Sequence, residues 1–281
     1  MKMELTELKK HYRQAAAKIP HDSFYFEANN HKYRHSIDVL HAGQELLQDT
    51  PELANVSADF KIQAQRALLF HDIGRFEENI RRYESELAQH ELSALSNTYD
   101  HGLIGYEILQ NSPPYNDLRI LFAVRYHGKM MSEVKQSPMW HEIEKLPPEQ
   151  ADEIKKILYL VRDADKLANL RVQKAQHHLR QDAFYKQLSP EAVIGPFSAL
   201  PKEQFFAEQT VDYTNLKTYA DRVLMVLSWI YDFNYRRTKQ LFFEHQYDAY
   251  LLGELQTCKI TPSDFKAVQN ILENFHQNIT V

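Results

Sequence analysis

Apolar side chains recur at three- and four-residue intervals along most of this chain, as they do on one face of an α-helix. No segment alternates apolar and polar residues as a half-buried strand would, and 7 glycines and 11 prolines in 281 residues argue against a turn-rich β fold. The segment 188–209, which contains three prolines, is predicted to be a long irregular connection. The periodicity predicts helices over residues 5–16, 34–47, 59–70, 103–109, 118–126, 154–170, 214–243 and 263–275, the last with Ser263 as its N-cap.

The predicted fold class is therefore all-α, a helical bundle with a C-terminal helical extension. The length suits one domain over residues 1–281. Within it we expect a core of about residues 25–180 and an extension over residues 181–281. The extension is rich in apolar and aromatic residues, so we expect it to pack on the core.

Composition narrows the possible partners. The net charge is −5, with basic and acidic residues interspersed, which argues against a nucleic-acid surface or a polybasic membrane patch. The one cysteine, Cys258, excludes an internal disulfide and a Cys-rich zinc site. The N-terminus lacks a signal peptide's apolar run, and no stretch is long enough for a membrane helix. We therefore expect a soluble, cytoplasmic protein with no membrane partner, and a homodimer is a possible assembly.

The strongest local signal is LLFHDIGRF, residues 68–76, in which an apolar helix ends at His71-Asp72 and Gly74 follows as a stop signal. Adjacent helical residues diverge by about 100°, but near a helix end the backbone can open and both side chains can reach one ion. Imidazole with carboxylate suits Zn²⁺, Mn²⁺, Fe²⁺ or Ni²⁺ better than Ca²⁺. From these two residues alone, a buried histidine with an aspartate cap is an equal alternative.

Two further residues favour a metal site. His35 lies beside an apolar stripe in KYRHSIDVL, and Asp165 lies inside the apolar helix LVRDADKLANL. A carboxylate buried there is costly unless it is paired or metal-bound. Three helices can thus offer His35, His71-Asp72 and Asp165 to one point, with coordination positions left for water and substrate.

In this order and setting, the sequence resembles the HD superfamily of metal-dependent phosphohydrolases, whose signature is His, His-Asp and Asp on a helical bundle. The resemblance covers residues 31–172, and HDIGRF and the ADKL of residues 164–167 are typical of it. The chain also resembles an uncharacterised bacterial subgroup, in which LSWIYDFN (residues 227–234) is similar to the C-terminal helix. The resemblance implies one or two divalent ions, of Mn, Fe, Ni, Zn or Mg.

Two histidines fit the two-metal version of this family. His101 lies in DHGLIGYEIL and His127 in VRYHG. The resemblance implies that they hold a second ion, and that Asp72 bridges both ions. The alternatives are that they bind substrate phosphate or only line a polar pocket.

The family pattern selects Asp165 over Asp163 as the ligand, because the ligand directly precedes a basic residue and leucine. Asp163 is then a partner of Arg162 or a supporting group. Arg75 and Lys166 adjoin the ligands and could bind the substrate phosphate, or be surface cations. Glu77 and Glu78 are predicted to lie at a solvated helix start. The remaining histidines singled out are predicted to lie outside the site: His31, His41, His90, His141, His177 and His178.

The implied activity is hydrolysis of a phosphate ester, with nucleotides favoured, by a metal-activated water. Asp72 would orient the water, and Arg75 and Lys166 would offset charge on the phosphate. The chain has no P-loop, and it lacks the GYP tripeptide of cyclic di-GMP phosphodiesterases. Cys258 has no histidine near it in the sequence and is a poor nucleophile candidate. Two alternatives stay open: a di-iron oxygenase of the HD type, and a nucleotide-binding sensor with little turnover.

Overall fold

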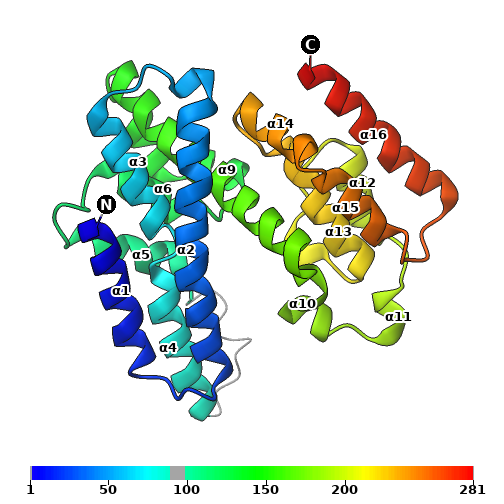
Figure 1. Cartoon of the computed structure of the whole chain (residues 1–281), viewed down its shortest axis with the longest axis horizontal. Helices are drawn as coiled ribbons and strands as arrows, with labels where there is room; N and C mark the ends of the chain where they lie inside the picture. The colour runs from blue at the N-terminus through cyan, green and yellow to red at the C-terminus, as the bar shows by residue number, and fades with distance from the viewer. Residues whose placement is uncertain (1, 89–98, 281) are drawn as a thin grey trace. The chain divides into compact units, whose positions relative to one another are not determined.

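A computed structural model describes residues 2–88 and 99–280, and it divides the chain into two compact units, residues 1–168 and 169–281 (Figure 1). Every regular element in these residues is a helix, which confirms the all-α prediction. His90 lies outside the described residues. Among the described helices, none is both long enough and apolar enough to cross a membrane.

The first unit is a bundle in which α2 packs on α1, α3 and α4, and α5 packs on α4 and α6. Figure 1 shows α1, α2 and α4 running side by side. Helix α9 starts in this unit and continues past Ala168. The helices are α1 (Lys2–Ala16), α2 (Phe24–Asp49), η1 (Pro51–Leu53), α3 (Ala58–Phe70), α4 (Gly74–Leu87), α5 (His101–Gln110), α6 (Leu118–Tyr126), α7 (Met131–Gln136), α8 (Pro138–Glu144) and α9 (Pro148–Gln176).

The second unit is built from shorter helices. Helix α13 packs on α12 and α15, and α16 packs on α14. After the end of α9 the elements are η3 (His178–Arg180), α10 (Ala183–Lys186), α11 (Pro190–Val193), α12 (Ala199–Phe206), η4 (Tyr213–Asn215), α13 (Tyr219–Leu227), η5 (Ser228–Tyr231), α14 (Arg236–Glu244), α15 (Tyr247–Leu255) and α16 (Pro262–Thr280).

The prediction of an irregular connection over 188–209 is wrong, because α11 and α12 lie there. Proline is tolerated in the first turn of a helix, where its missing N–H has no intrahelical partner. Pro190 is the first residue of α11, and the hydroxyl of Ser189 accepts the N–H of Ala192 at 3.2 Å. Pro201 lies in the first turn of α12. Two of the three prolines thus lie in the first turn of a helix, and Pro196 lies in the connection between α11 and α12.

The single helix predicted over 214–243 is also wrong, since the chain leaves the helix after α13. The hydroxyl of Ser228 donates to the carbonyl of Met225 at 2.7 Å and accepts the N–H of Val211 at 2.9 Å. A serine that bonds to backbone in this way competes with the helical ladder. The LSWIYDFN segment accordingly spans the end of α13, the 3-10 helix η5 and a turn.

The last helix begins one residue earlier than predicted and has a different cap. Helix α16 starts at Pro262, and the hydroxyl of Thr261 accepts the N–H of Asp264 at 3.1 Å. Thr261 therefore does the capping that the sequence pattern assigned to Ser263.

Candidate metal centre

A turn between α3 and α4 places the His71-Asp72 pair of the first unit. Helix α3 ends at Phe70, and residues 71–73 form a turn before α4. The turn closes through the N–H of Ile73 on the carbonyl of Phe70 at 3.0 Å and the N–H of Arg75 on the carbonyl of Asp72 at 2.9 Å. His71 and Asp72 are both buried. The opened helix end thus lets adjacent side chains face one centre, as predicted.

The tautomer of His71 is set by its own helix. Its Nδ1 lies 2.8 Å from the carbonyl oxygen of Leu68, and a carbonyl can only accept, so Nδ1 carries the proton. His127, just past the end of α6, repeats this arrangement with the carbonyl of Val124 at 3.0 Å. Both rings therefore turn Nε2, the metal-binding nitrogen of this tautomer, away from their own helices.

His35 and Asp165 form the second side of the centre. His35 is buried on α2, and its Nε2 lies 2.8 Å from Oδ1 of Asp165 on α9. The same oxygen is 3.9 Å from Nε2 of His71. The side chain of Asp165 is 24% exposed, whereas the residue Asp163 is fully buried. Asp165 thus faces both the histidines and the outside.

His101 and His127 approach from the opposite side of Asp72. The Nε2 atoms of the two rings lie 3.2 Å apart, and each is 3.4 Å from Oδ1 of Asp72. The other carboxylate oxygen of Asp72 lies 3.6 Å from Nε2 of His71. The carboxylate of Asp72 therefore stands between the two groups of histidines, which is the placement that a bridging ligand needs.

The donor atoms fit a divalent metal. Two groups of side chains place one ligand atom each within 4.8 Å of one another: His35, His71 and Asp165, and His71, Asp72 and His127. His71 belongs to both groups. Its Nε2 is fully buried and has no hydrogen-bond partner in the described part of the chain. A buried nitrogen without a partner is costly, and a bound cation would supply that partner.

The family comparison agrees with this geometry. Residues 33–170 match the family model of the HD domain. This chain is an HD-domain protein. HD domains bind divalent metals and are commonly phosphohydrolases, so a metal-dependent hydrolase activity follows at this coarse level. The search of curated proteins and the search of solved structures found no match.

In this HD domain, burial lowers the pKa of two candidate imidazoles, those of His35 and His101. The pKa of His35 lies below its usual value, and that of His101 lies well below it, with the charge of Arg75 adding to the effect of burial. Both rings are thus neutral near pH 7, which is the form that binds metals. The pKa of His71 is raised instead, because the carboxylates of Asp72 and Asp165 outweigh its burial.

Both carboxylates stay ionised despite their enclosure. Burial alone would raise the pKa of Asp72, but the ammonium of Lys32 and the ring of His71 hold it well below its usual value. The pKa of Asp165 is also lowered: burial raises it, but the hydrogen bond from His35 and neighbouring positive charge together outweigh burial. The site therefore presents carboxylates rather than carboxylic acids to a cation.

Two cations, Lys32 and Arg75, lie against Asp72, and the sequence analysis identified only Arg75. Nζ of Lys32 lies 2.8 Å from Oδ2, and Nε of Arg75 lies 3.6 Å from Oδ1. Lys32 precedes His35 by three residues and so shares its helix face, a signal that the sequence analysis missed. Lys166 is buried on α9, with its ammonium 3.5 Å from the carbonyl oxygen of Arg162.

Glu78 corrects a further prediction. It was expected at a solvated helix start, but it is only 2% exposed. Its carboxylate accepts from Arg75 at 2.8 Å and from Arg82 at 2.9 Å. Burial of a carboxylate is tolerated when cations surround it. Glu78 therefore fixes the position of the Arg75 guanidinium.

His31, placed outside the site by the sequence analysis, stacks on His35 with 6.1 Å between the ring centroids.

Arg162 is a second residue that the sequence analysis did not place. Its guanidinium is buried and donates to the carbonyls of Tyr126, His127 and Lys129 at 3.4, 2.8 and 2.5 Å. These carbonyls belong to the turn that ends α6. Arg162 thus fixes the backbone from which His127 projects.

We expect Arg162→Met to destabilise the protein by about 3 kcal/mol, because it leaves these carbonyls without their charged donor. Urea unfolding monitored by circular dichroism measures the change. Lys156→Met is the control on the same helix, since Lys156 makes a surface ion pair with Asp152 at 2.7 Å. A loss for Arg162→Met no larger than for the control would contradict this role.

Gly74 has a different purpose from the predicted helix stop. It is the first residue of α4 and has no positive φ. A Cβ at Gly74 would lie 2.0 Å from the carbonyl oxygen of His101 and 2.6 Å from the backbone nitrogen of Gly105. The missing side chain therefore allows α4 and α5 to touch, which brings Asp72 and His101 together.

Gly74→Ala is expected to destabilise the protein by about 3 kcal/mol, because two helix backbones must separate. It should also weaken metal binding, since His101 moves with α5. Gly253→Ala is the control, because a Cβ there meets nothing within 4 Å and alanine favours a helix. Thermal unfolding with and without Mn²⁺ checks both effects. Equal behaviour of the two variants would disprove the close-approach argument.

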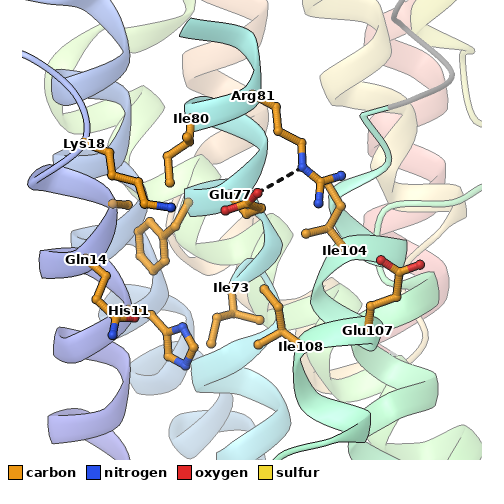
Figure 2. A pocket seen from close by; sticks show the side chains of 12 residues that line it. His11, Gln14, Lys18, Ile73, Glu77, Ile80, Arg81, Ile104, Glu107 and Ile108 are labelled. Atoms are coloured by element: carbon orange, nitrogen blue, oxygen red, sulfur yellow. Dashed lines mark hydrogen bonds and ion pairs between the residues drawn. The ribbon is translucent and has the colours of Figure 1, made fainter. Parts of the chain in front are cut away.

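A cavity of about 330 Å³ in the first unit lies away from this chemistry (Figure 2). It is formed by α1, α4 and α5, and its lining combines the isoleucines at 73, 80, 104 and 108 with polar side chains that include His11, Lys18 and Arg81. None of the candidate ligands lines it. A smaller cavity of about 210 Å³ is lined by His101 and His127 and adjoins the cluster.

Proposed function

We propose that this HD-domain protein hydrolyses a phosphate ester, with nucleotides the favoured class, at the His–Asp cluster of the first unit. The observation that carries the proposal is a pair of donor groups that share His71. His71 lies against one carboxylate oxygen of Asp72, and His127 lies against the other. A sensor with little turnover would not require this complete donor set beside two cations.

The chain offers ligands for two divalent ions. His35, His71 and Asp165 would hold one, and His101 and His127 would hold the other with Asp72 between them. Ions bound there would polarise a phosphoryl oxygen and activate water. Asp72, buried among these histidines, would orient that water by accepting a hydrogen bond from it.

The cations would bind the phosphate. Lys32 and Arg75 already lie on opposite oxygens of Asp72, and their side chains are 26% and 32% exposed. They therefore reach the cluster from positions that an anion can approach. Arg75 is held by Glu78, so its remaining N–H groups have a fixed direction for phosphate oxygens. Lys166 stays a proposed third cation beside Asp165.

The test is metal analysis of the purified full-length protein, followed by an anaerobic panel of phosphomonoesters and nucleotides with Mn²⁺, Mg²⁺, Ni²⁺ and Fe²⁺. We expect turnover without oxygen that depends on added metal. Oxygen consumption with a mixed-valent iron signal, and no anaerobic phosphate release, would instead support the di-iron oxygenase. Tight nucleotide binding without turnover in any metal would support the sensor.

Lys32→Met is expected to raise KM for a phosphate ester by about tenfold or more, since one charge-assisted contact to the phosphate is lost. Metal content should be retained, because Lys32 donates to Asp72 and supplies no ligand. Arg34→Met is the matched control on the same helix, where Arg34 is exposed and bonds to the carbonyl of Asn30. An unchanged KM, or loss of metal together with activity, would contradict the role of Lys32.

A further inference from the structure

A pocket beside the cluster has its own charge pattern. The cavity of about 210 Å³ is lined by His101 and His127, and also by Asp100, Arg125 and Lys129. The two histidines belong to the cluster and to the pocket at once. A molecule whose phosphate lies at the cluster can therefore extend into this pocket.

Asp100 is fully engaged and cannot neutralise both cations. Its Oδ2 accepts from Arg125 at 2.9 Å and from Lys129 at 3.0 Å. Its Oδ1 accepts the N–H of Leu103 at 3.1 Å and so caps α5. The pKa of Asp100 is lowered: burial raises it, but hydrogen bonds from Lys129, from Arg125 and from the backbone outweigh that. One carboxylate against two cations leaves the pocket with a net positive charge.

Both cations keep donors for a ligand. A guanidinium has five N–H groups and an ammonium has three, and Asp100 takes one from each side chain. An apolar group placed here would leave these donors without partners. A second anionic group would satisfy them, and Gly128, where a Cβ would meet only the ring of His101 at 3.5 Å, leaves room for it.

We propose that Arg125 and Lys129 form a second anion subsite, and that the substrate is a phosphate ester carrying a second anionic group, such as a further phosphate or a carboxylate. This inference rests on the proposed function, because it places the scissile phosphate at the cluster. Arg125 and Lys129 bind the second group, and Asp100 holds the two side chains at the pocket wall.

The experiment compares three phosphomonoesters that differ only in their tails: ethyl phosphate, phosphoglycolate and 2-aminoethyl phosphate. Binding to the metal-loaded full chain is measured by calorimetry, and kcat/KM is measured beside it. We expect phosphoglycolate to bind at least about tenfold more tightly than ethyl phosphate, and 2-aminoethyl phosphate to bind most weakly.

Lys129→Gln should reduce the preference for phosphoglycolate over ethyl phosphate towards one. Lys145→Gln is the control, since Lys145 is 68% exposed and pairs only with Glu142 in the contacts described. A second variant, Gly128→Ala, narrows the pocket instead of removing charge. A Cβ at Gly128 meets only the ring of His101, at an ordinary 3.5 Å, and Gly128 has no positive φ. It should also lower the preference while metal content is retained.

Equal binding of the three esters by the unmodified protein would overturn the subsite. So would an equal loss for all esters in Lys129→Gln, which would assign Asp100, Arg125 and Lys129 to positioning His101 alone. If the preference is found but no ester is hydrolysed, the subsite stands and the proposed hydrolase function fails.

Discussion

His71→Ala is expected to remove the ion held with His35 and Asp165 and to lower kcat/KM by at least about a thousandfold. His71 is the one residue that belongs to both donor groups, and its buried Nε2 has no hydrogen-bond partner in the described chain, so its loss also disturbs the group of Asp72 and His127. Loss of the ion removes several kcal/mol of charge stabilisation, and each 1.36 kcal/mol is a factor of ten in rate. Metal analysis after dialysis and an assay with added Mn²⁺ measure the two effects.

His141→Ala is the matched control, because its side chain is 59% exposed on α8 and lies outside both donor groups. A second variant, Asp72→Asn, separates loss of the site from loss of the fold, since it keeps the shape of the side chain and removes its charge. It should lose activity to a similar extent with an unchanged far-ultraviolet circular dichroism spectrum. Full metal content in His71→Ala would show that the cluster is not the metal site.

Asp165→Asn and His127→Ala are expected to lose one ion each, so that the stoichiometry falls from two to one in both variants. Asp165 belongs only to the group with His35, and His127 belongs only to the group with Asp72. Each variant should lose about a hundredfold or more in kcat/KM, because one of two charge-stabilising ions is missing. Equilibrium titration with Mn²⁺ followed by electron paramagnetic resonance counts the ions.

Both variants should also differ from the unmodified protein in their paramagnetic signal. At saturating Mn²⁺, the spin coupling between neighbouring ions should be present in the unmodified protein and absent from both. One ion per chain in the unmodified protein, retained in His127→Ala, would reduce the centre to the His35, His71 and Asp165 group. His101 and His127 would then be substrate-binding or pocket residues, as the sequence analysis also allowed.

Most helices of the first unit were predictable because each buries one apolar stripe, and that spacing is local. Helices α1, α2, α3, α5, α6 and α9 all overlap the predicted helices, although α2 begins at Phe24 instead of residue 34 and α9 covers Pro148–Gln176 instead of 154–170. Helices α4, α7 and α8 were not among the predicted ranges. The second unit was harder to predict. The prolines of α11 and α12 and the serine that ends α13 act through hydrogen bonds that periodicity does not record. Packing of the extension on the core stays a prediction.

The sequence by itself determined the order and types of the candidate ligands, because the His-Asp pair, its helix end and the flanking apolar runs are all local features. Only the tertiary structure decided which charges meet there. Lys32 reaches Asp72 across 40 residues of chain, and Asp165 reaches His35 across 130. Arg162 holds the turn of His127 from another helix, and a missing Cβ at Gly74 lets α4 touch α5. Such contacts depend on how helices cross, which no spacing within one helix specifies.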